Sequence, residues 1–146
     1  MAEIRQICLP LQLYTNVYEG EKGMANCPLC SLDMQKEKIF YQDDLFIVLR
    51  TAKLKGHRER IMIVYKQHQN TISYEEYERA LKIVSDIGRE VFKYAPKFVI
   101  LDGTFASIKD HWHLVASDLD PKSEDFDQIL ATRWIKVLDN THQCQT

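Results

Sequence analysis

The chain has 146 residues, a length typical of one domain with a single hydrophobic core. Hydrophobic residues make up 45% and charged residues 27%, which is a globular composition and excludes a compositionally disordered chain. The formal net charge of −2 argues against strong binding to duplex DNA or RNA, because such binding needs an excess of Lys and Arg. A small anionic ligand remains compatible with this charge.

No apolar run approaches the roughly 18 residues of a membrane span, and the first residues lack the pattern of a signal peptide. We therefore expect a cytoplasmic protein with no membrane partner. Four cysteines are too few for a disulfide framework. Two of them, Cys27 and Cys30, are separated by two residues, which favours a metal site and leaves a redox pair as the alternative.

The first half of the chain predicts an N-terminal extension followed by three strands. Residues 1–26 show no clear periodicity. After the cysteine pair, two β-rich runs flank a polar turn, and a third apolar run follows a basic connection. The expected strands are 38–41, 45–49 and 61–65.

A long amphipathic helix is expected over residues 74–94. Ser73 and Glu76 form a capping box at its start, and apolar residues recur at three- and four-residue steps. Pro96 ends this pattern.

Two further strands and a second helix complete the expected order. The strands are 98–101 and 111–116, and a helix begins after Ser123 with an apolar stripe that extends to Leu138. Because several strands are joined by hairpin-length connections, the order predicts an α+β domain with a mainly antiparallel sheet and two main helices.

Two histidines separated by one residue, His111 and His113, lie in the last expected strand. Side chains alternate along a strand, so both imidazoles leave the same face, about 6–7 Å apart. They can share one metal ion, or one can bind the metal while the other faces a substrate. Of the remaining histidines, His68 ends the third strand and His57 lies in the basic connection, from which it could contact a phosphate.

In their order along the chain, these features resemble the histidine-triad superfamily, which includes nucleotidyl hydrolases and, more distantly, galactose-1-phosphate uridylyltransferase. The resemblance covers residues 27–120, and residues 121–146 are expected to pack on the same domain as a helix and tail. It rests on the cysteine pair, the turn Tyr41-Gln42-Asp43-Asp44, Lys55-Gly56-His57, Lys66-Gln67-His68, Asp102-Gly103 and His111-x-His113.

The resemblance implies an α+β, usually dimeric protein that acts on the α-phosphate of nucleotide esters, anhydrides or phosphoramidates. A structural Zn²⁺ ion would be held by Cys27, Cys30, His68 and His111. Neutral His113 would attack the α-phosphorus through one ring nitrogen, with a backbone carbonyl on the other. Hydrogen bonds to the phosphoryl oxygens would come from Ser107, Lys109 and His57.

The family pattern has three alternating histidines, whereas this sequence has two. The pair can therefore be aligned with the family pattern in two ways. If His111 is the first, His113 is the nucleophile and Val115 replaces the third. If Lys109 replaces the first, His111 is the nucleophile and the zinc loses a ligand. We favour the first register because it keeps four ligands. The uridylyltransferase branch also lacks the third histidine, but valine cannot donate a hydrogen bond to phosphate.

Two segments near the expected ligand also differ from the family. The strand that usually ends in an Asp that holds the ribose ends here in Arg50, and residues 58–60 are an insertion before the next strand. An alternative therefore stays open: a catalytically weak or inactive zinc-stabilised module that binds a nucleotide or a partner. A third arrangement places both His111 and His113 on the metal and leaves His68 free.

Overall fold

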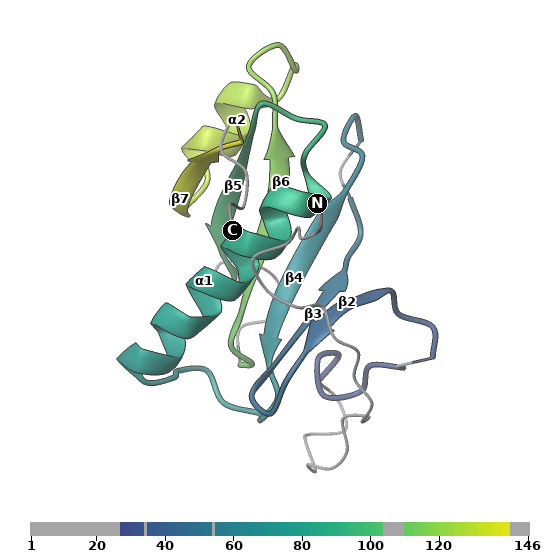
Figure 1. The fold of residues 1–146 in the computed structure, drawn as a ribbon, viewed down its shortest axis with the longest axis vertical. Coiled ribbons are helices and arrows are strands. Elements are labelled where there is room, and N and C mark those ends of the chain that lie inside the picture. Colours follow the sequence, from purple (N-terminus) through teal and green to yellow (C-terminus); the bar gives the residue numbers. More distant parts are fainter. Residues whose placement is uncertain (1–26, 34, 54, 104–109, 141–146) are drawn as a thin grey trace, which may run out of the picture.

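The structure is a computed structural model that describes residues 27–33, 35–53, 55–103 and 110–140. These residues form one six-stranded sheet of order β2-β3-β4-β6-β5-β7 and two helices (Figure 1). All the strand pairs are antiparallel, which confirms the expected α+β class with a mainly antiparallel sheet. The elements are β2 (Ile39–Gln42), β3 (Phe46–Arg50), β4 (Arg60–Tyr65), α1 (Tyr74–Val91), β5 (Lys97–Asp102), β6 (His113–Leu119), α2 (Phe126–Ala131) and β7 (Trp134–Asp139).

Helix α1 lies across one face of the sheet (Figure 1). Its capping box is as expected: the Ser73 hydroxyl accepts from Glu76 N at 3.1 Å, and the Glu76 carboxylate accepts from Ser73 N at 3.0 Å. The apolar stripe of α1 packs on alternate residues of the strands, among them Ile63 and Phe98. This contact forms the largest apolar cluster of the described residues and fixes α1 on the sheet.

The other face of the sheet, which we call the second face, carries two separate apolar clusters. One joins β3 and β4 to the turn of the cysteine pair, and the other joins β5 and β6 to α2. The buried members of the first are Cys27, Leu29, Ile47, Leu49, Met62 and Val64. Those of the second are Val99, Leu101, Val115, Leu119 and Ile129.

The expected second helix is wrong in its C-terminal half. Helix α2 ends at Ala131, and Trp134–Asp139 forms β7, in which Val137 pairs with Val99 of β5. Residues 134–137 alternate between exposed and half-buried, as a strand on the edge of a sheet does. Because β7 pairs with β5, the backbone of β5 has hydrogen-bond partners on both sides, from β6 and from β7. A helix at residues 134–139 would leave one edge of β5 unpaired.

The strand that holds the histidine pair also begins later than expected, at His113, so His111 lies just before β6. No helix among the described residues is both long and apolar enough to cross a membrane.

Candidate metal centre

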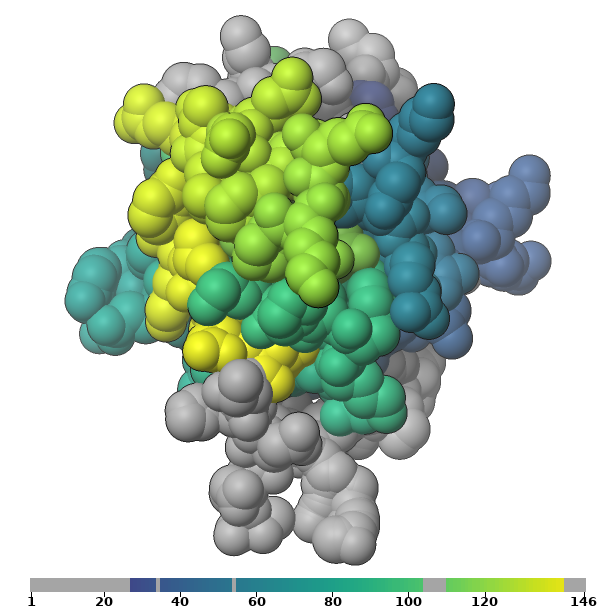
Figure 2. Space-filling view, turned by 90° about the horizontal axis from the view of Figure 1, so that it is seen from above, coloured from purple at the N-terminus to yellow at the C-terminus, as the bar shows by residue number. Residues whose placement is uncertain are grey.

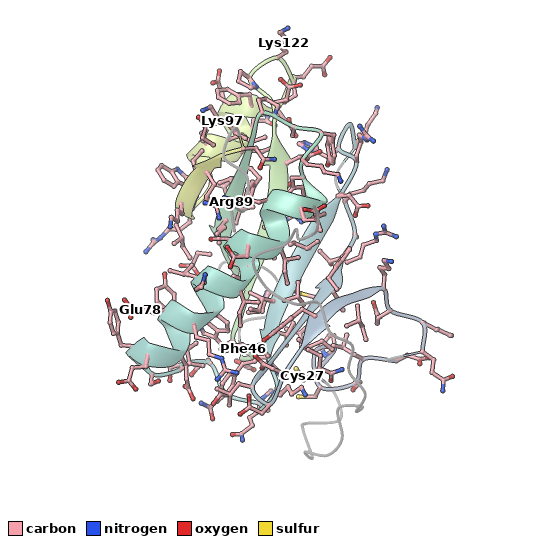
Figure 3. All side chains as sticks on the ribbon, in the orientation of Figure 1. Cys27, Phe46, Glu78, Arg89, Lys97 and Lys122 are labelled. Carbon is pink, nitrogen blue, oxygen red and sulfur yellow. The ribbon has the colours of Figure 1, made fainter. Side chains whose placement is uncertain are left out.

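Four side chains of the types that bind metal ions meet where β4 ends and β6 begins. They are Cys27, Cys30, His68 and His111, and their ligand atoms all lie within 4.8 Å of one another. Figure 3 shows Cys27 at the same end of the sheet as Phe46, the first residue of β3. The fold therefore brings together the four residues predicted to hold a metal, from three separate segments of the chain.

The distances between the ligand atoms suit a tetrahedral ion. The Nδ1 atom of His68 lies 3.1 Å from Cys30 Sγ, and His111 Nδ1 lies 3.3 Å from Cys30 Sγ and 3.5 Å from Cys27 Sγ. A tetrahedral site with metal–sulfur bonds of about 2.3 Å and metal–nitrogen bonds of about 2.0 Å has edges of roughly 3.3–3.8 Å. The set of two thiols and two imidazoles can thus hold a metal ion with little movement.

Local hydrogen bonds explain why these side chains face one another. Cys30 N donates to Cys27 O at 3.0 Å, which closes the tight turn that brings the two cysteines together. His111 Nε2 donates to the carbonyl of Tyr65 at 2.6 Å, so its Nδ1 is left facing the sulfurs. Burial lowers the pKa of His111, which favours the neutral imidazole that binds metal ions.

His113 is buried on the second face, opposite Val64, and is not one of the four clustered residues. Its Nδ1 donates to the carbonyl of His111 at 2.9 Å, so Nε2 carries the lone pair, which has no hydrogen-bond partner among the described residues. Burial lowers its pKa and keeps the ring neutral. Because His68 is the fourth clustered side chain, the geometry does not match the arrangement with both His111 and His113 on the metal.

Gly103, which follows β5, is required for the close approach of the chain to His113. A Cβ atom at this position would overlap the carbonyl oxygen of His113. We expect Gly103→Ala to lower the free energy of unfolding by about 1–3 kcal/mol, because the backbone of β6 must shift. Urea denaturation measures this effect. Gly56→Ala is the comparison, since a Cβ there meets no atom within 4 Å and only its positive φ of 88° is unfavourable. Equal stability of Gly103→Ala and the unsubstituted protein would contradict this account.

His57, expected from the sequence to contact a phosphate, has other partners in the structure. His57 pairs with Asp118, near the far end of β6, and its Nε2 lies 2.7 Å from Asp125 Oδ2. Both ring nitrogens therefore face carboxylates, and neither is left to donate to a phosphate. The other two expected phosphate donors, Ser107 and Lys109, lie outside the described residues.

Figure 2 shows the connection before β4 (blue), the segment after α1 (green) and the residues after β6 (yellow-green) next to one another on one surface. The polar side chains around His57 lie where these segments meet. The Tyr94 hydroxyl donates to Asp118 Oδ2 at 2.6 Å, and the Arg58 guanidinium stacks 4.1 Å from the centre of the Tyr94 ring. Ser123 donates to Asp125 at 2.9 Å. This cluster joins three parts of the chain that are distant in sequence: residues 57–58, Tyr94 and residues 118–125.

A pocket of about 500 Å³ opens beside the cysteine turn. It lies on the second face of the sheet, next to the apolar cluster of β3 and β4. Leu29, Leu49 and Met62 form apolar parts of its wall, and Lys36 and Lys38 add positive charge. The sequence interpretation did not identify this pocket. The signal available in the sequence was the alternation of side chains between the two faces of β3 and β4. This alternation places Leu49 and Met62 on the same face as His113.

No protein-family model and no curated protein matches the chain.

Proposed function

We propose that the protein is a zinc-stabilised nucleotidyl hydrolase or transferase of the histidine-triad type, with His113 as the nucleophile. The observation that carries this proposal is the environment of His113: a buried, neutral imidazole with Nδ1 held by the His111 carbonyl at 2.9 Å. This arrangement fixes the tautomer in which Nε2 can attack. A homodimer and a cytoplasmic location, both expected from the sequence, belong to the same proposal.

We propose zinc as the ion of the metal centre, because two sulfur and two nitrogen donors in a tetrahedral set are typical of structural zinc sites. Cys27, Cys30, His68 and His111 would hold it. When bound, the ion would stabilise the fold, since four protein ligands leave no position for a water molecule. The chemistry of the reaction is therefore assigned to His113.

In the proposed reaction, His113 Nε2 forms a bond to the α-phosphorus while the bond from phosphorus to the leaving group breaks and the leaving group takes a proton. Water or another acceptor then attacks the phosphorus, releases His113 and gives up a proton. The pocket beside the cysteine turn supports a nucleotide substrate, because its apolar wall suits a base and Lys36 and Lys38 suit phosphate.

His113→Ala tests the proposal most directly. We expect nucleotide release from a nucleoside phosphoramidate to fall about a hundredfold or more, because the variant has no nucleophile. Chromatography of the released nucleotide measures the loss. Zinc content, measured by atomic absorption, should not change, because His113 is not one of the four clustered residues. His142→Ala, at a histidine with no role assigned, is the control variant. Full turnover by His113→Ala would disprove the assignment.

One observation favours the second candidate function, a zinc-stabilised binding module without turnover. Val115, which stands where the third histidine is expected, packs among apolar residues and offers no hydrogen bond to a phosphate. In this case mononucleotides would raise the melting temperature of the protein, but a panel of nucleotide esters and phosphoramidates would not be turned over.

A further inference from the structure

Arg60, the first residue of β4, has an unusual environment. Its Nη1 atom is buried and has no hydrogen-bond partner, and none of the described carboxylates pairs with its side chain. Burial lowers the pKa of the guanidinium, because the charged form loses its contact with water. Arg60 as a whole is partly exposed, but a buried polar atom without a partner costs stability, so its presence in a fold needs an explanation.

The two neighbouring arginines differ from Arg60 because the side chain of each has a partner within the protein. Arg50 makes two hydrogen bonds to Glu59, at 3.0 and 2.8 Å. Arg58 stacks on the ring of Tyr94. The missing partner is therefore a particular property of Arg60 and not of this end of the sheet.

The register of β4 and β6 places Arg60 on the same face as the proposed nucleophile. Arg60 pairs with Ser117, and Val64, four residues further along β4, pairs with His113. Four residues of a strand span about 13 Å. An extended arginine side chain is roughly 7 Å long from its bond lengths, so its guanidinium can approach the space above Val115.

A seam between the two apolar clusters of the second face runs along β4 and β6 in this region. Met62 and Val115 are direct partners across the strands, yet they pack into different clusters. Each keeps some exposure, 8% for Met62 and 7% for Val115. Met62 also lines the pocket beside the cysteine turn, and so does Thr51, whose backbone N donates to Arg60 O at 2.9 Å. The backbone of Arg60 therefore pairs with a residue of the pocket wall, at the far end of a seam that begins at His113.

We propose that Arg60 binds a second anionic group of the ligand, a phosphate or a carboxylate, separate from the phosphate that His113 attacks. The position of the attacked phosphate rests on the proposed function. The anion supplies the partner that the guanidinium lacks, and charge-assisted hydrogen bonds to a carboxylate or phosphate are among the strongest available. The ligand is accordingly a nucleotide conjugate with a further anionic group about 10 Å or less from the reacting phosphorus.

Thermal denaturation of Arg60→Met tests this assignment, because methionine keeps part of the length of the side chain and removes the charge. Without added anions, the variant should melt at the same temperature as the unsubstituted protein or higher, since a charged group with a buried, unpaired nitrogen is removed. Sodium pyrophosphate at constant ionic strength should raise the melting temperature of the unsubstituted protein by about 2–5 °C and that of the variant little or not at all. Citrate is the second probe: a shift with pyrophosphate alone assigns a phosphate, and a shift with citrate alone assigns a carboxylate.

Arg89→Met is the matched control, because Arg89 lies on α1, beyond the other face of the sheet, and pairs with Asp86. This variant loses the same single positive charge, and pyrophosphate should raise its melting temperature as much as that of the unsubstituted protein. Arg60→Lys should keep part of it.

Three results would overturn the proposal: a full response in Arg60→Met, no response of the unsubstituted protein to either anion, or a large loss of stability of Arg60→Met without anions. The last would show a structural role for Arg60. His113→Ala should keep the response whether or not it loses turnover. Failure of the enzymatic proposal is therefore measured separately from failure of the Arg60 assignment.

Discussion

Replacing Cys30 by serine is expected to remove the metal ion and to lower the free energy of unfolding by about 5 kcal/mol or more, enough to unfold a domain of ordinary stability. Cys30 Sγ contacts both histidines of the metal centre, at 3.1 and 3.3 Å. Through them a bound metal would join the cysteine turn to the segment that follows β4 and to the segment just before β6. Atomic absorption after dialysis measures the metal, and urea denaturation measures the stability.

Cys8→Ser is the control for this experiment, because Cys8 is a cysteine outside the predicted set of ligands. It should keep one metal ion per chain and the stability of the unsubstituted protein. A strong chelator should bring the unsubstituted protein and Cys8→Ser to the stability of Cys30→Ser, because all three then lack the ion. Retention of both metal and stability by Cys30→Ser would contradict the assignment of the metal centre.

The metal centre could be predicted from sequence because its residue types are chemically specific. The spacing of Cys27 and Cys30 favoured a metal site over a redox pair. His68 and His111 joined the expected set through the resemblance to the histidine-triad superfamily, and the structure brings all four together. Helix α1 was predictable for a similar reason, because Ser73 and Glu76 carry a local signal that the structure reproduces.

Strand β7 could not be predicted in this way. Ile129 and Leu130 follow helical spacing, and Val137 and Leu138 can be read as a continuation of that stripe. The strand forms because β5 offers an unpaired edge, which is a property of the whole sheet and not of the local sequence.

The partners of His57, and the absence of a partner for Arg60 Nη1, could not be predicted from the sequence for a related reason. Asp118 and Asp125 follow His57 by 61 and 68 residues, so only the folded chain shows that both ring nitrogens are used. The missing partner of Arg60 likewise becomes visible only after the partners of Arg50 and Arg58 are known.

Replacing His57 by alanine is expected to lower the free energy of unfolding by about 3–5 kcal/mol near pH 6. His57 is 5% exposed, and its removal leaves Asp118 and Asp125 facing a cavity without the positive charge between them. Lys55→Ala, at an exposed position of the same connection, should change the stability by less than about 0.5 kcal/mol. Urea denaturation of both variants across the pH range measures the two effects.

The pH dependence of this difference is a sharper test than its size. Burial acts to lower the pKa of His57, but hydrogen bonds to Asp125 and Asp118 outweigh it, so the pKa is raised above its usual value of 6.5. A raised pKa means that the stabilisation is fully present below about pH 6.5 and is lost as the pH rises through the pKa of the folded protein. At acid pH the stabilisation is limited by Asp125, whose pKa is lowered because its carboxylate is stabilised by His57. This contribution is lost when the carboxylate is protonated.

The stability difference between the unsubstituted protein and His57→Ala should therefore be largest in mildly acid solution and become smaller at lower and at higher pH. The metal centre is common to both proteins and cancels from the difference. A difference that grows steadily above pH 7 would show that His57 is held as a neutral imidazole and would contradict the ion pair.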